Sequence, residues 1–186
     1  MNKLLSTYLL IGIFFTSSLL SAQSDEVTQL PDCSFKFSVA TSARKSTIWG
    51  LWTDVENWKK YDTILEYSYL VSDSAFEVGA IGYVKADGVP RTKFELIEVN
   101  ESVSFIERLK LPLFHAIELQ RYFEVNNSGS TTFTHEVNFK GPLRYLIYAL
   151  AGPTFRRELP LVMGRLKDLA ESEEQQETDI NFPSTN

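Results

Sequence analysis

The chain has 186 residues, of which 44% are hydrophobic and 13% aromatic, and its formal net charge is −6. This composition is typical of one globular domain and excludes a disordered or fibrous chain. The acidic balance gives a pI near 5.0, with no lysine-rich or arginine-rich segment to offset it. A nucleic-acid partner is therefore not expected, because phosphate backbones bind basic surfaces.

The first 24 residues have the pattern of a signal peptide. Lys3 supplies a positive start, residues 4–20 are mostly apolar, and small residues follow up to Ser24. A membrane anchor is the alternative, but serines and threonines interrupt the apolar run, which is also short for a bilayer span. We expect cleavage after Ala22 or Ser24 and an exported protein, periplasmic or secreted, with no membrane span after cleavage.

Residues that commonly bind metals are scarce. Cys33 is the only cysteine, so an intramolecular disulfide and a cysteine metal cluster are excluded, and we interpret it as a half-buried residue before the first strand. His115 and His135 are the only histidines, and neither lies in a zinc-binding motif. No metal and no cofactor is expected.

Hydrophobic periodicity predicts one α+β domain over residues 33–171. A strand at 35–40 is followed by a helix at 43–52 and by a second short helix that ends near residue 61. Six more strands are expected, at 65–71, 80–85, 93–99, 103–110, 115–125 and 131–139. The turns between them are short, which implies an antiparallel meander, because parallel strands need longer crossovers.

The C-terminal part is predicted to be helical. Residues 143–150 form a short apolar segment, and Gly152-Pro153 is expected to restart a longer helix that runs through Ala170. One face of that helix is apolar, with Phe155, Leu159, Val162, Leu166 and Leu169. This stripe must lie against one face of the sheet. Residues 172–186 are polar without periodicity, which predicts a disordered tail.

This order of elements resembles the helix-grip fold of the Bet v 1-like superfamily, also known as START or SRPBCC. Local stretches are similar to its polyketide cyclase/dehydrase and coenzyme-Q-binding branch, at residues 48–58, 134–142, 159–161, 166–167 and 170–171. The resemblance covers about residues 35–171. It implies a curved antiparallel sheet of about seven strands wrapped around the C-terminal helix, with a cavity for an apolar small molecule between them.

Strand parity identifies polar side chains on the apolar face of the predicted sheet. Glu107 falls on that face in one strand, His115 and Arg121 in the next, and His135 in the last. Aromatic residues share this face or belong to the segment before the long helix. The candidate ligand-binding residues are Glu107, Arg121, His135, Phe105, Phe123, Phe133, Tyr145 and Tyr148.

The register between the last two strands sharpens this expectation. If the turn is centred on Ser128, Arg121 lies directly opposite His135, and Glu107 is one strand away. Two interpretations stay open: an internal ion pair that serves the fold, and a polar anchor for the head group of a ligand. Tyr145 and Tyr148 are expected at the mouth of the cavity, because their segment is too apolar to be fully exposed.

Three function classes follow. The favoured one is a carrier that holds an apolar small molecule, such as a lipid, a quinone or a polyketide-like compound. The second is a cyclase or aromatase-like enzyme in which His135, with Glu107 or Arg121, serves as a general base. The third is an envelope protein-interaction module. No catalytic residue is assigned, because the chain has no Gly-x-Ser-x-Gly, no phosphate-binding glycine loop and no recognisable pair of catalytic carboxylates.

Export predicts a defined mature N-terminus. Because small residues follow the apolar run, N-terminal sequencing of the exported protein should find a chain that begins at Gln23 or Asp25. An exported protein that still begins at Met1 would contradict the cleavage.

Overall fold

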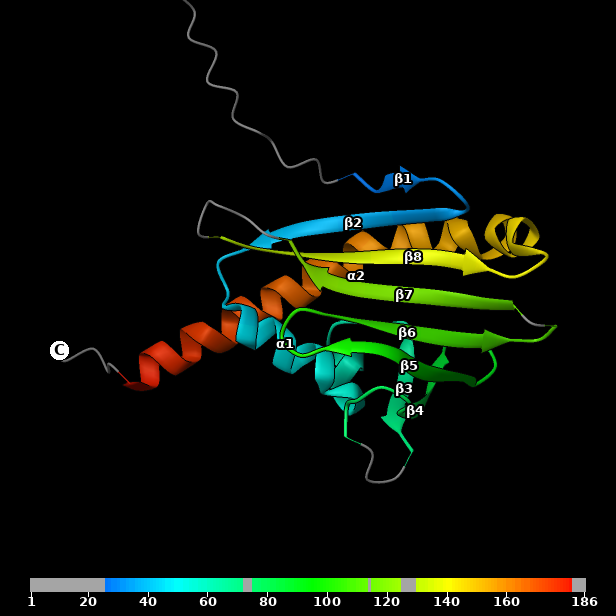
Figure 1. The fold of residues 1–186 in the computed structure, drawn as a ribbon. Helices are drawn as coiled ribbons and strands as arrows, with labels where there is room; N and C mark the ends of the chain where they lie inside the picture. Colours follow the sequence, from blue (N-terminus) through cyan, green and yellow to red (C-terminus); the bar gives the residue numbers. More distant parts are fainter. Residues whose placement is uncertain (1–25, 72–74, 114, 125–129, 182–186) are drawn as a thin grey trace, which may run out of the picture.

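The computed structural model describes residues 26–71, 75–113, 115–124 and 130–181 (Figure 1). The predicted signal peptide at 1–24, the centre of the predicted turn at Ser128 and the last five residues lie outside the described residues.

Eight strands form one curved antiparallel sheet, in the order β1-β2-β8-β7-β6-β5-β4-β3 (Figure 1). They are β1 (Thr28–Leu30), β2 (Ser34–Thr41), β3 (Leu65–Leu70), β4 (Ile81–Ala86), β5 (Thr92–Asn100), β6 (Ser104–Leu111), β7 (His115–Phe123) and β8 (Thr131–Lys140). From β3 to β8 each strand pairs with the next, which confirms the predicted meander. β1 was not predicted, because its three residues are too few to show an alternation.

Two short helices and one long helix complete the domain. α1 (Lys45–Thr53) and the 3-10 helix η1 (Val55–Lys60) follow β2, as predicted. α2 (Arg144–Asn181) packs against β2, β8 and α1 (Figure 1). The stripe through Leu159, Val162 and Leu166 is buried, which confirms the predicted helix face and the α+β helix-grip arrangement. No helix in the described ranges has an apolar stretch long enough to cross a bilayer.

α2 is continuous where the sequence predicted a break. It begins at Arg144 and runs through Gly152 and Pro153, so the apolar segment at 143–150 is the first part of the same helix. A proline removes one N–H donor from the helix, and the carbonyl that loses its partner is that of Ala149. Because Ala149 is exposed, water can satisfy that carbonyl, and the helix tolerates the proline.

The tail that was predicted to be disordered is helical through Asn181. Acidic residues fix this part of α2 to the loop between β2 and α1. Glu171 accepts hydrogen bonds from Thr41 Oγ1 at 2.8 Å and from the Ser42 backbone N–H at 3.0 Å. The prediction failed because these partners are about 130 residues away in the sequence.

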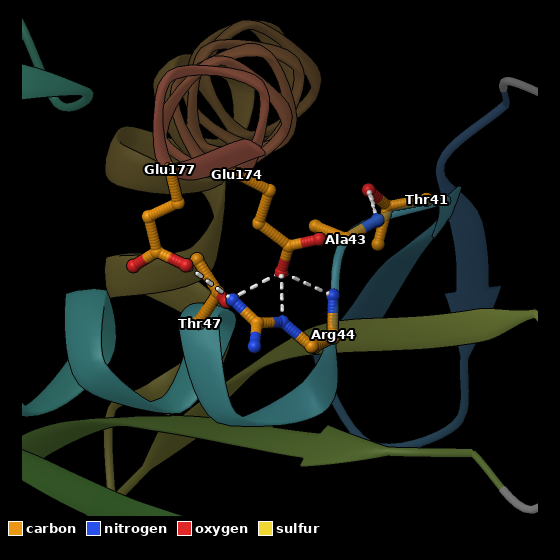
Figure 2. A network of polar contacts seen from close by, with 6 residues as sticks. All are labelled: Thr41, Ala43, Arg44, Thr47, Glu174 and Glu177. Carbon is orange, nitrogen blue, oxygen red and sulfur yellow. Dashed lines mark hydrogen bonds and ion pairs between the residues drawn. The ribbon is translucent and has the colours of Figure 1, made fainter. Parts of the chain in front are cut away.

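Glu174 and Glu177 extend this attachment (Figure 2). Glu174 Oε1 accepts hydrogen bonds from the Arg44 backbone N–H at 2.7 Å and from Thr47 Oγ1 at 2.5 Å. The Arg44 guanidinium reaches both carboxylates, with Nη2 2.6 Å from Glu177 Oε2. Exposed ion pairs add little to stability. The Glu174 oxygen, which also accepts from a backbone N–H and a hydroxyl, therefore matters more than either ion pair.

The buried helix face predicts a clear contrast between neighbouring positions. Leu166→Ala should lower the free energy of unfolding by about 2–5 kcal/mol, because its side chain is fully packed between helix and sheet. Asp168→Ala, on the exposed face, should change it by less than about 0.5 kcal/mol. Urea unfolding of both variants tests this, and equal losses would contradict the assigned face.

Candidate functional site

The centre of the sheet carries a buried ion pair where the sequence predicted polar side chains. Arg121 on β7 lies opposite His135 on β8, so the predicted register is confirmed. Glu107 on β6 is diagonal to Arg121, and Arg121 Nη2 lies 3.2 Å from Glu107 Oε1. All three side chains are buried, with Glu107 only 2% exposed.

Two further charged residues join this group from other elements. Asp62 follows η1, and its carboxylate interacts electrostatically with both Arg121 and Arg165. Arg165 comes from the middle of α2. The sheet, the turn after η1 and the long helix thus contribute to one polar cluster, which consists of Asp62, Glu107, Arg121, His135 and Arg165.

Every member of the polar cluster has one buried side-chain atom without a hydrogen-bond partner. These atoms are Asp62 Oδ1, Glu107 Oε2, Arg121 Nη1, His135 Nε2 and Arg165 Nη1. Among the residues that the structure describes, no other buried side-chain nitrogen or oxygen is in this state. Buried polar groups are nearly always paired, and each unpaired one costs about 1–3 kcal/mol. Within the described part of the chain, the unpartnered buried side-chain atoms thus all belong to the polar cluster.

Aromatic rings enclose the Arg121 guanidinium. Its Cζ lies 4.8 Å from the centre of the Trp58 ring and 5.1 Å from that of Phe105. Rings at this distance attract a cation through their negative faces, and they also keep water away from it. Arg121 therefore remains charged while lying in an apolar layer, since a guanidinium does not lose its proton in proteins.

Burial shifts the titration of the groups around Arg121. It raises the pKa of the Glu107 and Asp62 carboxyls, and the nearby Arg121 guanidinium opposes both rises. It also raises the pKa of the neighbouring Tyr61 hydroxyl. The pKa of His135 lies well below its usual value, first because of burial and second because of Arg121. His135 is therefore a neutral imidazole at physiological pH.

The three candidate phenylalanines pack beside the polar cluster around Trp52. The ring centre of Trp52 lies 5.9 Å from that of Phe105, 4.8 Å from Phe123 and 6.0 Å from Phe133. All four side chains are buried. The predicted residues on the sheet are thus brought together, with an apolar wall next to the charged groups.

The two candidate tyrosines on α2 lie elsewhere. Tyr148 packs against Phe35 and Phe139, and its hydroxyl donates to Gln29 Oε1 at 2.8 Å. Tyr145 is 62% exposed, with the Arg144 guanidinium over its ring. As expected, the segment is not fully exposed, because one side of the helix, with Ile147 and Tyr148, faces the core.

His115 has a different role from His135, although both are buried. Its Nε2 accepts the Leu143 backbone N–H at 2.9 Å, and its Nδ1 lies 3.0 Å from the Pro112 carbonyl oxygen. A neutral ring with the proton on Nδ1 satisfies both bonds. His115 therefore joins the β6–β7 turn to the start of α2. In the described part of the chain, no three His, Cys, Asp or Glu side chains are grouped to hold a metal ion.

Asp62 and Arg165 were missed by the sequence analysis. Arg165 is next to Leu166 and three residues after Val162, so a helical wheel would have placed it at the border of the buried stripe. Asp62 has no such signal, because it follows a 3-10 helix whose position depends on tertiary packing.

Comparison with known proteins supports the fold. The sequence matches no family model, and no curated protein matches it. Its structure is similar to that of an Arthrobacter aurescens protein, with a TM-score of 0.61 and 13% identity over 79% of this chain and 91% of that one. A Nitrosomonas europaea protein gives a TM-score of 0.59 and 12% identity over 78% of this chain and 99% of that one. A Mesorhizobium loti protein gives a TM-score of 0.57 and 14% identity over 75% of this chain and 97% of that one. These proteins share the antiparallel sheet and C-terminal helix, and at such identities the likeness concerns the fold alone.

The depressed pKa of His135 predicts a specific pH dependence of stability. Below pH 6.5 the unfolded chain binds a proton at this histidine while the folded chain does not, so stability falls as pH falls. The loss is about 1.4 kcal/mol per pH unit until the folded-state pKa is reached. The raised pKa of Glu107 acts in the opposite direction, since the folded state gains protons there first.

Comparison of the wild type with His135→Gln isolates the contribution of His135 to the pH dependence of stability, because Glu107 and Asp62 titrate in both proteins. Between pH 7.5 and 5.5 the wild type should lose about 1.4 kcal/mol more than the variant in urea unfolding. A difference between the two proteins that is the same at both pH values would contradict a buried neutral His135.

Proposed function

We propose that the protein is a carrier of an apolar small molecule, held between the sheet and α2 with its head group at the polar cluster. The observation that carries the proposal is the set of five unpartnered polar atoms beside an aromatic wall. The arrangement supports a ligand site, because in such sites a few placed polar groups orient a molecule that apolar side chains surround. The resemblance to the Bet v 1-like superfamily, and to its polyketide cyclase/dehydrase and coenzyme-Q-binding branch, agrees with it.

The charges of the polar cluster indicate the kind of head group. Arg121 and Arg165 are cations, Asp62 and Glu107 balance them when ionised, and His135 is neutral. An anionic head group would leave a net charge in an apolar layer, which is costly. The unpartnered atoms include donors on the arginines and acceptors on the carboxylates. The best ligand is therefore uncharged and carries both an acceptor such as a carbonyl and a donor such as a hydroxyl or amide group, as polyketide-like compounds and some lipids do.

Native mass spectrometry of the purified protein tests ligand retention. The wild type should carry a bound apolar compound, which mild organic extraction should release. The double variant Arg121→Met/Glu107→Gln removes both charges of the ion pair at once, so neither charge is left buried alone. It should stay folded and retain at most about a tenth of the ligand, as expected for a loss of about 1.4 kcal/mol or more in binding.

Arg108→Met is the matched control. Arg108 follows Glu107 on β6, but its side chain is partly exposed and is paired with Glu118. It should retain the ligand as the wild type does. Full retention by the double variant would contradict the anchoring role. Full retention together with a large loss of stability in Arg121→Met alone would instead assign the ion pair to the fold.

A cyclase or aromatase-like enzyme is the second candidate, and His135 supports it. A neutral imidazole whose Nε2 is buried and unpartnered can accept a proton from a bound substrate. In that case His135→Gln should abolish turnover of the retained compound while the compound still binds. A carrier would show no turnover in either protein.

A further inference from the structure

The start of α1 is fixed by carboxylates of α2. Arg44, the N-cap residue of α1, makes no capping hydrogen bond through its side chain. Its backbone N–H donates to Glu174 Oε1 at 2.7 Å (Figure 2), and the backbone N–H of Ser42 donates to Glu171 Oε1 at 3.0 Å. We call Glu171 and Glu174 the latch. A helix of nine residues is marginal on its own, so α1 depends on contacts of this kind.

The end of α1 is fixed more firmly, through η1. Trp58 Nε1 donates to the Trp52 carbonyl at 2.9 Å, and Ser68 Oγ on β3 donates to the Val55 carbonyl at 2.6 Å. These four residues are buried, whereas the latch binds backbone N–H groups of exposed residues. Water can replace the latch contacts, so the start of α1 can separate from α2 while its end acts as a pivot.

α1 covers the aromatic wall beside the polar cluster. The Trp52 ring packs on Phe123 and Phe133 of the sheet, and at the start of α1 the Lys45 ammonium lies 4.9 Å from the centre of the Phe123 ring. The charged residues of the polar cluster that belong to the sheet are at most 8% exposed. A ligand can therefore reach them only if a covering element moves.

We propose that α1 is a lid over the ligand site and that the latch keeps it closed until a ligand enters or leaves. α2 is the less suitable element to move, because lifting it would expose the whole buried stripe through Leu159, Val162 and Leu166. Segments that open are those with the fewest buried contacts. This inference rests on the proposed function, because it concerns access to the same site.

Hydrogen exchange without ligand tests the latch. The double variant Glu171→Ala/Glu174→Ala removes both carboxylates, and alanine favours the helix, so α2 should be retained. Backbone amides of residues 48–53 should exchange about tenfold faster than in the wild type, while those of β7 and β8 should not change.

Glu173→Ala is the matched control, because it removes the same charge from the same turn of α2, and Glu173 takes no part in the network of Figure 2. It should exchange as the wild type does. Unchanged exchange in α1 of the double variant would overturn the proposal. So would an equal acceleration in α1 and β7, because the carboxylates would then stabilise the whole domain.

Stopped-flow fluorescence with Nile red, an uncharged apolar dye with a carbonyl, tests the lid. In the double variant the association and dissociation rates should both rise about tenfold with Kd nearly unchanged, because the same opening precedes entry and release. Unchanged rates despite faster exchange in α1 would overturn the lid. If the wild type binds neither Nile red nor a retained compound, the proposed function fails instead, and faster exchange in α1 would still support the latch.

Discussion

The apolar face of the sheet has to be kept from water, and the length of α2 determines how that is done. A helix of 38 residues is about 57 Å long, whereas the longest strand has 10 residues and spans about 33 Å. The helix therefore cannot lie on the sheet over its whole length. Tyr148 near its start packs against Phe35 and Phe139, and its last turns reach α1, where Glu174 accepts a hydrogen bond from the Arg44 backbone N–H.

The position of the polar cluster follows from the same packing. Arg121 cannot lose its charge, so each group around it either compensates that charge or shields it from water. Glu107 compensates it directly, and Trp58 covers the guanidinium from η1. Arg165 lies on the part of α2 that contacts the sheet. If the polar cluster served stability alone, apolar side chains in its place would stabilise the fold as well or better. We therefore connect the polar cluster with function.

Sequence periodicity was enough to predict most of the fold and part of the site. Alternation along β6, β7 and β8 identified the buried face, and a symmetric turn aligned Arg121 with His135 even though residues 125–129 are outside the described part of the chain. Asp62 and Arg165 could not be predicted, because their proximity depends on how η1 and α2 dock. The prediction of a disordered tail failed for a similar reason, because the residues at 41–47 that stabilise the end of α2 are distant from it in the sequence.

The pairing of β2 with β8 bears on how the chain folds during synthesis. Ser34 and Asn138 are joined by a side-chain hydrogen bond although 104 residues separate them. β2 leaves the ribosome early, but its only long partner is the last strand to be made, so Phe35 and Phe37 stay exposed until then. Closing so distant a contact is slow, and an unpaired apolar strand can associate with other chains in the meantime. Completion of the sheet therefore has to wait until β8 is available, and until then the apolar residues of β2 are open to association with other chains.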